Sequence, residues 1–362
     1  MSSVDVVIPC YNYAHYLESC VATVLAQGGV DVRILIVDDA SQDDTPAVGQ
    51  ALAARDGRIT YHRNAQNKGL VGTANVGVMD WAESKYTLLL SADDALTEGA
   101  LARAAGVMDR HPEVAMAYGL ARVVSGDFTT GRERFGPSFD YVVLSGSEFL
   151  ERSCLHWCGV ASPTALIRTS VQHQVGGLDP RFPSTCDMEI WMRIATQSSV
   201  AALNTVQAYY RRHDTNMSTA YMSRPLSDLR EQLATARTVL TERRVAPEEA
   251  AKLIGAMQGR LIVQTGWMAG LAFERGDIAG MKDCIAFASE INASAWRSMP
   301  WIKFHVKRLL GRGFAQAVRR MRTAQTAHTG AQQASTGDFD PFKVGELFGW
   351  WPEDKFSRTM TA

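Results

Sequence analysis

The stretch from residue 86 to residue 94 constrains the fold of this chain more than any other. Residues 88–90 form an apolar run of strand length without polar alternation, and Asp93 and Asp94 follow almost at once. Such a run is typical of a strand buried on both faces, as in a parallel sheet. Because ligands of open α/β sheets bind beyond the carboxyl ends of the strands, we expect the two acids at a ligand site. A helix N-cap in a solvated loop is the alternative interpretation.

Strand-like and helix-like segments alternate before this stretch. Strands are predicted at residues 4–9, 32–37 and 59–62, and helices at residues 16–27, 45–54 and 73–81. This alternation predicts an α/β fold with a parallel, Rossmann-like sheet. Asp38 and Asp39 follow the second strand, and parallel strands end at the same edge of a sheet. All four acids are therefore expected to face one crevice, where Mg²⁺ or Mn²⁺ would find oxygen ligands.

Composition narrows the class of protein. The chain has 362 residues, 46% of them hydrophobic, and a formal net charge of −1, so it carries no polyelectrolyte signal for nucleic acid. Its six cysteines form no C-x-x-C pair and are expected as free thiols. Neither a secretory signal nor a run of 18 apolar residues is visible, which favours a reduced, cytoplasmic compartment.

Four segments resemble the motifs of the family 2 glycosyltransferases in order and spacing, namely residues 6–12, 36–45, 67–77 and 91–94. The resemblance extends from residue 4 to about residue 220. It implies a GT-A fold, in which helices flank a mixed, mainly parallel sheet. It also implies a metal-dependent transfer of a sugar, with inversion, from a nucleotide-diphosphate sugar to an acceptor hydroxyl. UDP is the commonest nucleotide of the family, and the products are bacterial-type polysaccharides, glycolipids or glycoconjugates. A non-catalytic scaffold that binds nucleotide sugars is the alternative.

The resemblance also assigns donor-binding residues. The nucleotide would contact Pro9, Tyr11, Asn12, Asp39, Lys68 and Asp93, with Asp38 in support. The metal, Mn²⁺ or Mg²⁺, would be held by Asp93, Asp94 and His213 and would bridge the diphosphate. The chain departs from the family at Ser91, where the D-x-D motif has its first acid.

Residues 186–194 resemble the helix that carries the catalytic base of the family, and Asp187 matches the position of the base. Glu189 lies two residues further on, so both carboxylates cannot share one helical face and must have separate tasks. Glu189 and Arg193 are expected as supporting groups. Residues 209–218 resemble the segment that closes the catalytic domain, in which Arg211 would support the phosphates. His156 and Trp157 are expected at the acceptor side.

The rest of the chain lies outside the resemblance. We expect a catalytic domain at residues 1–222, a helical region at 223–322, and a linker with an aromatic docking tail at 323–362. Residues 301–322 hold seven basic residues, no acid and several large apolar ones. This pattern indicates either a helix on an anionic membrane or a helix packed on the domain. The tail would dock on this protein, on a second copy or on a lipid surface.

The expected partners are a nucleotide-sugar donor and a sugar or lipid-linked glycan acceptor, without nucleic acid. Peripheral contact with the inner face of the membrane and a homo-oligomer through the C-terminal region are further expectations. A receiver-type signalling domain is disfavoured because it leaves Asp187 and His213 without a role. A dehydrogenase would need a G-x-G-x-x-G after the first strand, which is absent here. A processive synthase is disfavoured because the family's Q-x-x-R-W motif and membrane spans are missing.

Overall fold

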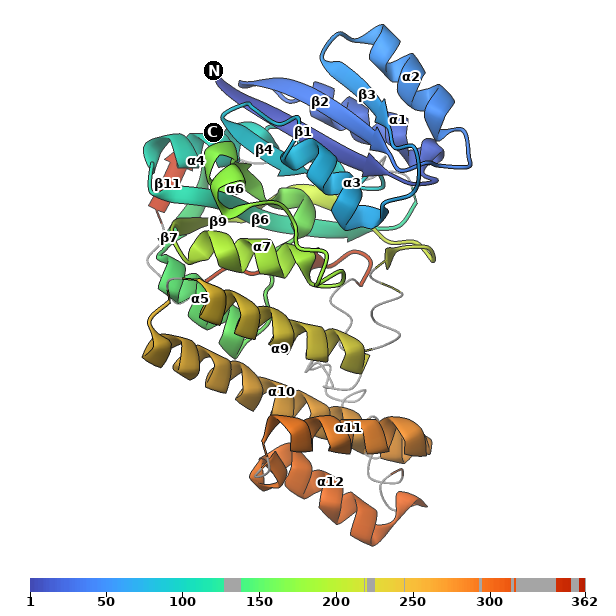
Figure 1. The fold of residues 1–362 in the computed structure, drawn as a ribbon, viewed down its shortest axis with the longest axis vertical. Helices are drawn as coiled ribbons and strands as arrows, with labels where there is room; N and C mark the ends of the chain where they lie inside the picture. The colour runs from blue at the N-terminus through green and yellow to red at the C-terminus, as the bar shows by residue number, and fades with distance from the viewer. Residues whose placement is uncertain are drawn as a thin grey trace.

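The structure is a computed structural model that describes residues 1–126, 138–217, 219, 225–243, 245–292, 295–313, 316, 343–352 and 358–361. A sheet with flanking helices forms one end of the molecule, and a stack of helices extends from it (Figure 1). The strands are β1 Ser2–Cys10, β2 Val30–Asp38, β3 Ile59–Arg63, β4 Tyr86–Leu89, β5 Ala95–Leu96, β6 Val114–Val124, β7 Ser138–Leu144, β8 Leu166–Arg168, β9 Ser199–Arg211, β10 Leu347–Phe348 and β11 Arg358–Thr361. The α-helices are α1 Ala14–Leu25, α2 Thr45–Arg55, α3 Gly69–Val78, α4 Ala100–Arg110, α5 Gly146–Leu155, α6 Thr169–Val175, α7 Cys186–Ala195, α9 Pro225–Glu242, α10 Pro247–Arg275, α11 Ile278–Ile291 and α12 Met299–Leu310.

The strands belong to one mixed sheet in the order β11-β7-β9-β6-β8-β4-β1-β2-β3, with β5 beside β9 and β10 beside β6. The ladders that join β1 to β2, β1 to β4, β2 to β3 and β6 to β9 are parallel, and the others are antiparallel. The register places Cys10 beside Asp38, and Asp38 beside Arg63. The carboxyl ends of these strands therefore meet at one edge, which confirms the predicted α/β sheet and the common edge for its acids.

The parallel half is buried on both faces, as its apolar strands predict. Val6 and Ile8 pack into the core formed with α1 and α4, whereas Val7 and Leu35 pack into the core formed with α3. Side chains of a strand alternate between faces, so a continuous apolar run serves both cores. Gly77 brings α3 close to the sheet, because an added Cβ would lie 2.1 Å from Val7 Cγ1.

One helix differs from its predicted bounds, and one long strand lies where no strand was predicted. The third helix, α3, begins at Gly69 rather than at residue 73, because Gly69 adopts a φ of 70° that most residues avoid. The 13-residue strand β9 is long and buried, but its run of small residues such as Ala201 and Ala202 carries little strand propensity. Pairing with β6 on one side and β7 on the other stabilises β9 as a strand instead.

The helical region shares a core with the sheet. One hydrophobic cluster joins Met116 of β6 and Trp191 of α7 to Leu233 of α9, Leu261 of α10 and Phe287 of α11. In Figure 1, α9 lies below α7 and α5, and α10 lies below α9. Helices α9 and α10 therefore pack as a further layer on the unit that contains the sheet.

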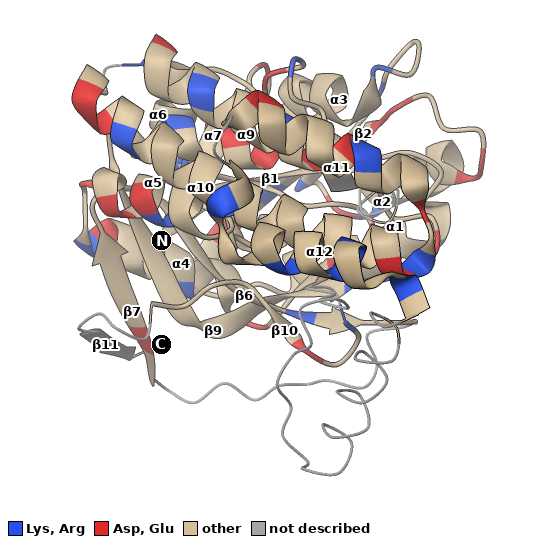
Figure 2. Ribbon diagram, turned by 90° about the horizontal axis from the view of Figure 1, so that it is seen from below, with Lys and Arg blue, Asp and Glu red and all other residues tan. Residues whose placement is uncertain are grey.

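Helix α12 packs on α10 through one face and leaves the other exposed. Trp301 is fully buried and its indole Nε1 donates a 2.9 Å hydrogen bond to the carbonyl of Ile262, and Phe304 is also buried. Leu309, however, is 87% exposed. Lys and Arg positions, coloured blue on the ribbon, lie along this helix in the view from below (Figure 2). Among the described residues, no helix combines the length and the apolar character that crossing a membrane requires.

The end of the chain returns to the sheet. Strand β10 pairs antiparallel with β6, with Phe348 opposite Ala121, and β11 pairs antiparallel with β7. Trp350 packs over the guanidinium of Arg152, which lies 4.2 Å from the ring centroid. Of the three docking surfaces expected for the tail, these contacts are with this protein itself. The linker predicted at the start of residues 323–362 and the basic residues Arg319, Arg320 and Arg322 lie outside the described residues.

Candidate active site

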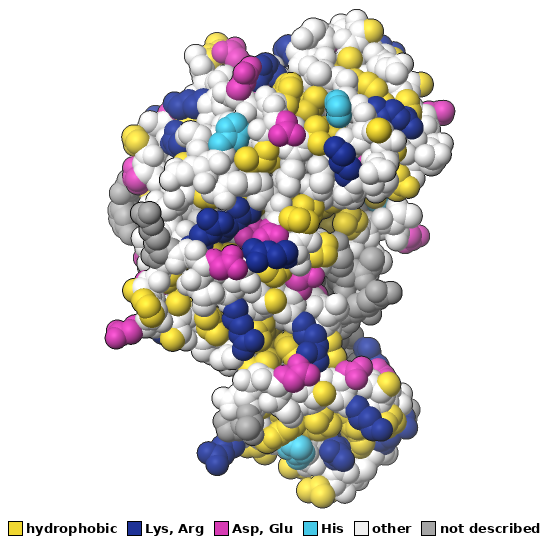
Figure 3. Space-filling view, viewed as in Figure 1, with side chains coloured by type: hydrophobic (Ala, Val, Ile, Leu, Met, Phe, Trp, Pro, Cys, Tyr) yellow, Lys and Arg dark blue, Asp and Glu magenta, His cyan; other side chains and the backbone are white. Residues whose placement is uncertain are grey.

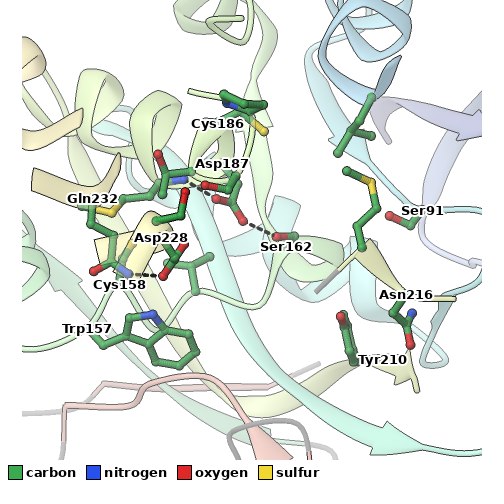
Figure 4. A pocket seen from close by; sticks show the side chains of 18 of the residues that line it. Ser91, Trp157, Cys158, Ser162, Cys186, Asp187, Tyr210, Asn216, Asp228 and Gln232 are labelled. Carbon is green, nitrogen blue, oxygen red and sulfur yellow. Dashed lines mark hydrogen bonds between the residues drawn. The ribbon is translucent and has the colours of Figure 1, made fainter. Parts of the chain in front are cut away.

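A cavity of about 1570 Å³ runs from the carboxyl ends of β1, β2 and β4 to helices α7, α9 and α10. Its lining includes Pro9, Tyr11 and Asp39 at one end, Ser91, Asp93 and Asp94 in the middle, and Asp187 and Asp228 further along. Figure 4 shows part of it, with Ser91 and Asn216 on one side and Asp187, Asp228 and Trp157 on the other. The crevice predicted from the strand ends is therefore present and holds the candidate base as well.

Asp38 and Asp39 point to different tasks although they are neighbours. Asp38 is fully buried, and its Oδ2 accepts hydrogen bonds from the Tyr61 hydroxyl at 2.6 Å and from Arg63 at 3.0 Å. Asp39 Oδ1 accepts from Asn64 Nδ2 at 2.9 Å and from the backbone amide of Lys68 at 2.8 Å. No described residue donates to Asp39 Oδ2. Asp38 thus fixes the loop, while Asp39 presents one oxygen to the cavity.

The loop after β1 is joined to the loop after β2 through Asn12. Its backbone amide donates to Ser41 Oγ at 3.0 Å, and its Oδ1 accepts from the amide of Gln42 at 2.8 Å. Asn12 has a φ of 60°, a conformation that Asn tolerates better than most residues. Neither Asn12 nor the side chain of Lys68 lines the cavity, whereas Tyr11 does and is 46% exposed. Asn12 shapes the pocket from behind.

Asp93 and Asp94 also have different hydrogen-bond partners. Asp93 Oδ2 accepts from Asn216 Nδ2 at 3.1 Å and lies 3.0 Å from His213 Nε2. Asp94 is buried, and its Oδ1 accepts from the backbone amide of Arg211 at 3.0 Å. Burial and the charge of Asp93 raise the pKa of the Asp94 carboxyl well above its usual range. Asp93 is the acid of this pair that is joined to His213.

Arg211 anchors this acidic loop. Its side chain is buried, its Nε donates to the carbonyl of Asp93 at 2.9 Å, and its guanidinium lies 4.3 Å from the ring centroid of Tyr16. Planar guanidinium groups stack on aromatic rings in this way. Arg211 therefore holds the loop that carries the two acids, and it does not line the cavity in which its support of the phosphates was predicted.

The donor atoms near Asp93 fit a divalent cation that also binds substrate phosphates. A carboxylate and an imidazole are ligands that Mn²⁺ accepts, and Mg²⁺ prefers the oxygen. Among the described residues, no group of three or more His, Cys, Asp and Glu side chains is arranged to hold a metal ion, so Asp93, Asp94 and His213 do not form a three-residue ligand set. The remaining ligands would have to be phosphate oxygens and water.

Asp187 stands in the first turn of α7, with both carboxylate oxygens engaged. Oδ2 accepts from the Ser162 hydroxyl at 2.9 Å, and Oδ1 accepts from the backbone amide of Met188 at 2.6 Å. Burial raises the pKa of this carboxyl, and the hydrogen bond from Ser162 opposes that rise. A carboxylate with a raised pKa in a cavity is suited to accept a proton.

Glu189 and Arg193 are buried residues of α7 and do not line the cavity. Arg193 Nη2 lies 2.5 Å from Glu189 Oε2, and Nη1 donates to the carbonyl of Val175 at 2.7 Å. The pair ties α7 to the turn after α6. Both residues therefore support the position of Asp187 rather than contact a substrate.

The sequence did not single out several residues of this site. Ser162 and Asp228 lack a local motif, whereas Asn216 belongs to the segment that closes the resemblance and could have been found there. Phe348 belongs to the predicted aromatic tail and reaches the cavity, with its ring centroid 5.3 Å from that of Trp157. Trp157 lines the cavity as expected, but His156 does not.

A mixed sheet with acids at the ends of its parallel strands, which share one cavity with Asp187, is the architecture expected of a GT-A glycosyltransferase. Residues 5–169 match the profile of Glycosyl transferase family 2, so this part of the chain carries the sequence pattern of that family. A GalNAc(5)-diNAcBac-PP-undecaprenol beta-1,3-glucosyltransferase of Campylobacter jejuni is 36% identical over 102 residues, which cover 28% of this chain and 33% of that protein. The chain thus aligns with about a third of that relative's length.

Solved structures share the fold at low sequence identity. S. aureus TarS 1-349 in complex with UDP-GlcNAc superimposes with a TM-score of 0.61 at 15% identity, over 98% of each chain. The mannosyltransferase PcManGT from Pyrobaculum calidifontis, in complex with GDP-Man and Mn²⁺, gives a TM-score of 0.56 at 16% identity, over 92% of this chain and 83% of that one. These matches support the GT-A fold of the whole described chain.

Proposed function

We propose that this glycosyltransferase transfers a sugar from a UDP-sugar to an acceptor hydroxyl with inversion, and that Asp187 is the base. The observation that carries the proposal is that Asp39, Asp93 and Asp187 line one continuous cavity. The Campylobacter relative is named for transfer to an undecaprenol-linked glycan, which supports a sugar or lipid-linked glycan as acceptor. The reaction belongs to polysaccharide, glycolipid or glycoconjugate synthesis.

The donor end of the cavity is built for a nucleotide. Asp39 Oδ2, to which no described residue donates, can accept from a base N–H or a ribose hydroxyl. Pro9 and Tyr11 line the same end and would cover the faces of base and ribose. The nucleotide sugars in the neighbouring structures, UDP-GlcNAc and GDP-Man, support this class of donor.

Asp93 and His213 would hold the metal near the diphosphate, with Ser91 in place of the first acid of the family's motif. Bound Mn²⁺ or Mg²⁺ supplies charge neutralisation for the leaving diphosphate. The Mn²⁺ in the PcManGT complex supports a divalent cation here. Arg211 holds the backbone carbonyl of Asp93 and Asn216 holds its carboxylate, so that the diphosphate would be oriented by a fixed group.

At the other end, Asp187 would accept the proton of the attacking hydroxyl. Its raised pKa makes it a stronger base than an exposed aspartate, and Ser162 fixes its orientation. Attack from the side of the base, opposite the leaving diphosphate, inverts the configuration at the anomeric carbon. One base suffices for this reaction.

A thermal-shift screen of nucleoside diphosphates with Mn²⁺ tests the donor, and release of UDP from UDP-sugars tests turnover. We expect stabilisation by UDP that disappears with EDTA, and UDP release that requires Asp187. UDP binding without any release of UDP from UDP-glucose, UDP-galactose or UDP-N-acetylglucosamine would favour the alternative, a scaffold that binds nucleotide sugars without catalysis.

A further inference from the structure

We propose that the part of the cavity between Trp157, Asp228 and Asp187 is the acceptor subsite, and that it takes an uncharged sugar residue. This inference rests on the proposed function, because it assumes that Asp187 receives the proton of the acceptor. It adds the chemical class of the acceptor group and three segments that build its site. These are the loop at Trp157, the first turn of α9 with Asp228, and the C-terminal strand β10 with Phe348.

Asp228 is held in a fixed orientation by a chain of hydrogen bonds. Its Oδ2 accepts from Gln232 Nε2 at 2.7 Å, and Gln232 Oε1 accepts from Arg260 Nη2 at 3.0 Å. Arginine can only donate, so the amide oxygen of Gln232 must face Arg260 and its NH₂ group must face Asp228. No described residue donates to Asp228 Oδ1. This chain therefore leaves one carboxylate oxygen for a ligand in the cavity.

Asp228 and the base face the same space. Figure 4 shows Asp228 beside Asp187, with the ring of Trp157 next to Asp228 on the side away from Cys186. The charges of Glu231 and Asp187, added to burial, raise the pKa of the Asp228 carboxyl. A hydroxyl-bearing ligand can donate to both acids, whereas a phosphate placed there would be repelled by both. Arg260 also lines the cavity, but it donates to Gln232 and to the carbonyl of Cys154, so the two acids favour an uncharged acceptor group.

Trp157 provides a flat apolar wall. It is 37% exposed and is supported from behind by Phe348, whose ring is tilted by 50° relative to the indole. Phe348 in turn lies 6.1 Å from the ring of Tyr210, centroid to centroid. A pyranose ring has one face of C–H groups, which packs on an aromatic ring, and an edge of hydroxyls, which a carboxylate binds. A tryptophan and an acceptor-only oxygen side by side match both features.

The experiment measures binding of simple sugars to the full chain saturated with UDP and Mn²⁺. The probes are methyl glycosides of glucose, galactose, mannose and N-acetylglucosamine, and glycerol 3-phosphate is the anionic comparison. Saturation-transfer NMR gives the affinity of each probe. We expect at least one glycoside to bind, glycerol 3-phosphate not to compete with it, and Asp228→Asn and Trp157→Ala to weaken it about tenfold or more.

Matched controls are Asp80→Asn and Trp81→Ala, because both residues lie outside the cavity. They should bind the glycoside as the wild type does. Phe348→Ala provides a further variant, which should weaken glycoside binding while UDP affinity stays unchanged. The inference is overturned if no glycoside binds the wild type, if Asp228→Asn and Trp157→Ala bind as tightly as the wild type, or if glycerol 3-phosphate displaces the glycoside. If the wild type binds the glycoside but does not bind UDP, the proposed donor is contradicted and the acceptor subsite remains supported.

Discussion

Glu231 Oε1 on α9 lies 2.9 Å from the backbone nitrogen of Thr185, the residue that precedes helix α7. The same oxygen accepts from the amide of Ser184 at 2.7 Å. A carboxylate at a helix N-terminus satisfies amides that have no partner within the helix, and it interacts favourably with the helix dipole. Asp187 follows two residues later. A residue of the helical region therefore holds the start of the helix that carries the proposed base, Asp187.

Glu231→Ala is expected to lower kcat about tenfold, with the KM for the donor nearly unchanged, because the turn before Asp187 loses its acceptor. Glu231→Gln keeps an oxygen that can accept from both amides and should recover most of the rate. Steady-state kinetics on both variants, with a melting curve for each, make the comparison. Equal loss in both variants would show that the charge rather than the hydrogen bonds matters.

The acidic limb of the pH–rate profile should report Asp187. A base acts only when it is deprotonated, so activity falls as the pH drops through its pKa. Because burial raises the pKa of Asp187, this fall should begin at a higher pH than for an ordinary aspartate. Asp187→Asn should lower kcat by about two to four orders of magnitude with little change in donor affinity. A near wild-type kcat in this variant would remove Asp187 from the role of base.

Ser162→Ala tests the role of Asp187 by removing the hydroxyl that donates a hydrogen bond to its carboxylate. The Ser162 hydroxyl stabilises the charged form of Asp187, so its removal should raise the pKa further and move the acidic limb to higher pH. At high pH the rates of the variant and the wild type should converge. A limb that stays in place, or moves to lower pH, would contradict the assignment.

Asp93→Asn should abolish metal-dependent UDP binding and leave the fold intact, because the amide keeps an oxygen that can accept from Asn216. The affinity for UDP with Mn²⁺ is expected to fall about 100-fold or more. Isothermal titration with and without EDTA measures it. Unchanged Mn²⁺-dependent affinity for UDP in Asp93→Asn would exclude a role of Asp93 in metal binding.

Asp38→Asn should instead lower the free energy of unfolding by about 2 kcal/mol, because Tyr61 and Arg63 lose a charged acceptor.

Local patterns predicted the parallel half of the sheet and the strand ends that carry Asp39 and Asp93. Apolar runs and the acids that follow them are neighbours in the chain, so sequence spacing is sufficient to find them. From the same pattern, Asp93 and Asp94 were predicted to bind the metal together. Successive side chains after a strand point in different directions, and Asp94 turns to the backbone of Arg211 instead.

Contacts between segments far apart in the chain could not be predicted from patterns of neighbouring residues. Glu231 and Thr185 are 46 positions apart, and Phe348 lies opposite Ala121 in the sheet. Nothing in the residues around Glu231 or Asp228 distinguishes them from solvated acids on a helix. The boundary expected at residue 222 followed the end of the resemblance. The hydrophobic core continues across it, from Trp191 to Leu233.

The outer face of α12 should bind an anionic membrane. Residues 301–322 were interpreted as a helix that either packs on the domain or lies on an anionic membrane. Trp301 and Phe304 pack on α10, so one face of α12 does pack on the domain. The opposite face carries exposed apolar side chains at helical spacing, namely Met299, Ile302, Val306, Leu309 and Leu310. Hydrophobic side chains mix with Lys and Arg on the lower lobe in Figure 3. An apolar stripe flanked by basic residues is the pattern of an interfacial helix, and each basic residue near an anionic surface contributes about 1 kcal/mol.

Liposome flotation measures this contact. The wild type is expected to float with phosphatidylglycerol vesicles at low salt, to float less at high salt, and to stay unbound with phosphatidylcholine alone. Ile302→Glu with Leu309→Glu should abolish flotation, because the two acids interrupt the stripe without touching the buried face. Ile278→Glu is the matched control, since Ile278 on α11 is 47% exposed but lies outside the stripe. If the wild type stays unbound at low salt, α12 serves only to pack against α10, and the acceptor must reach the enzyme without a membrane contact through this helix.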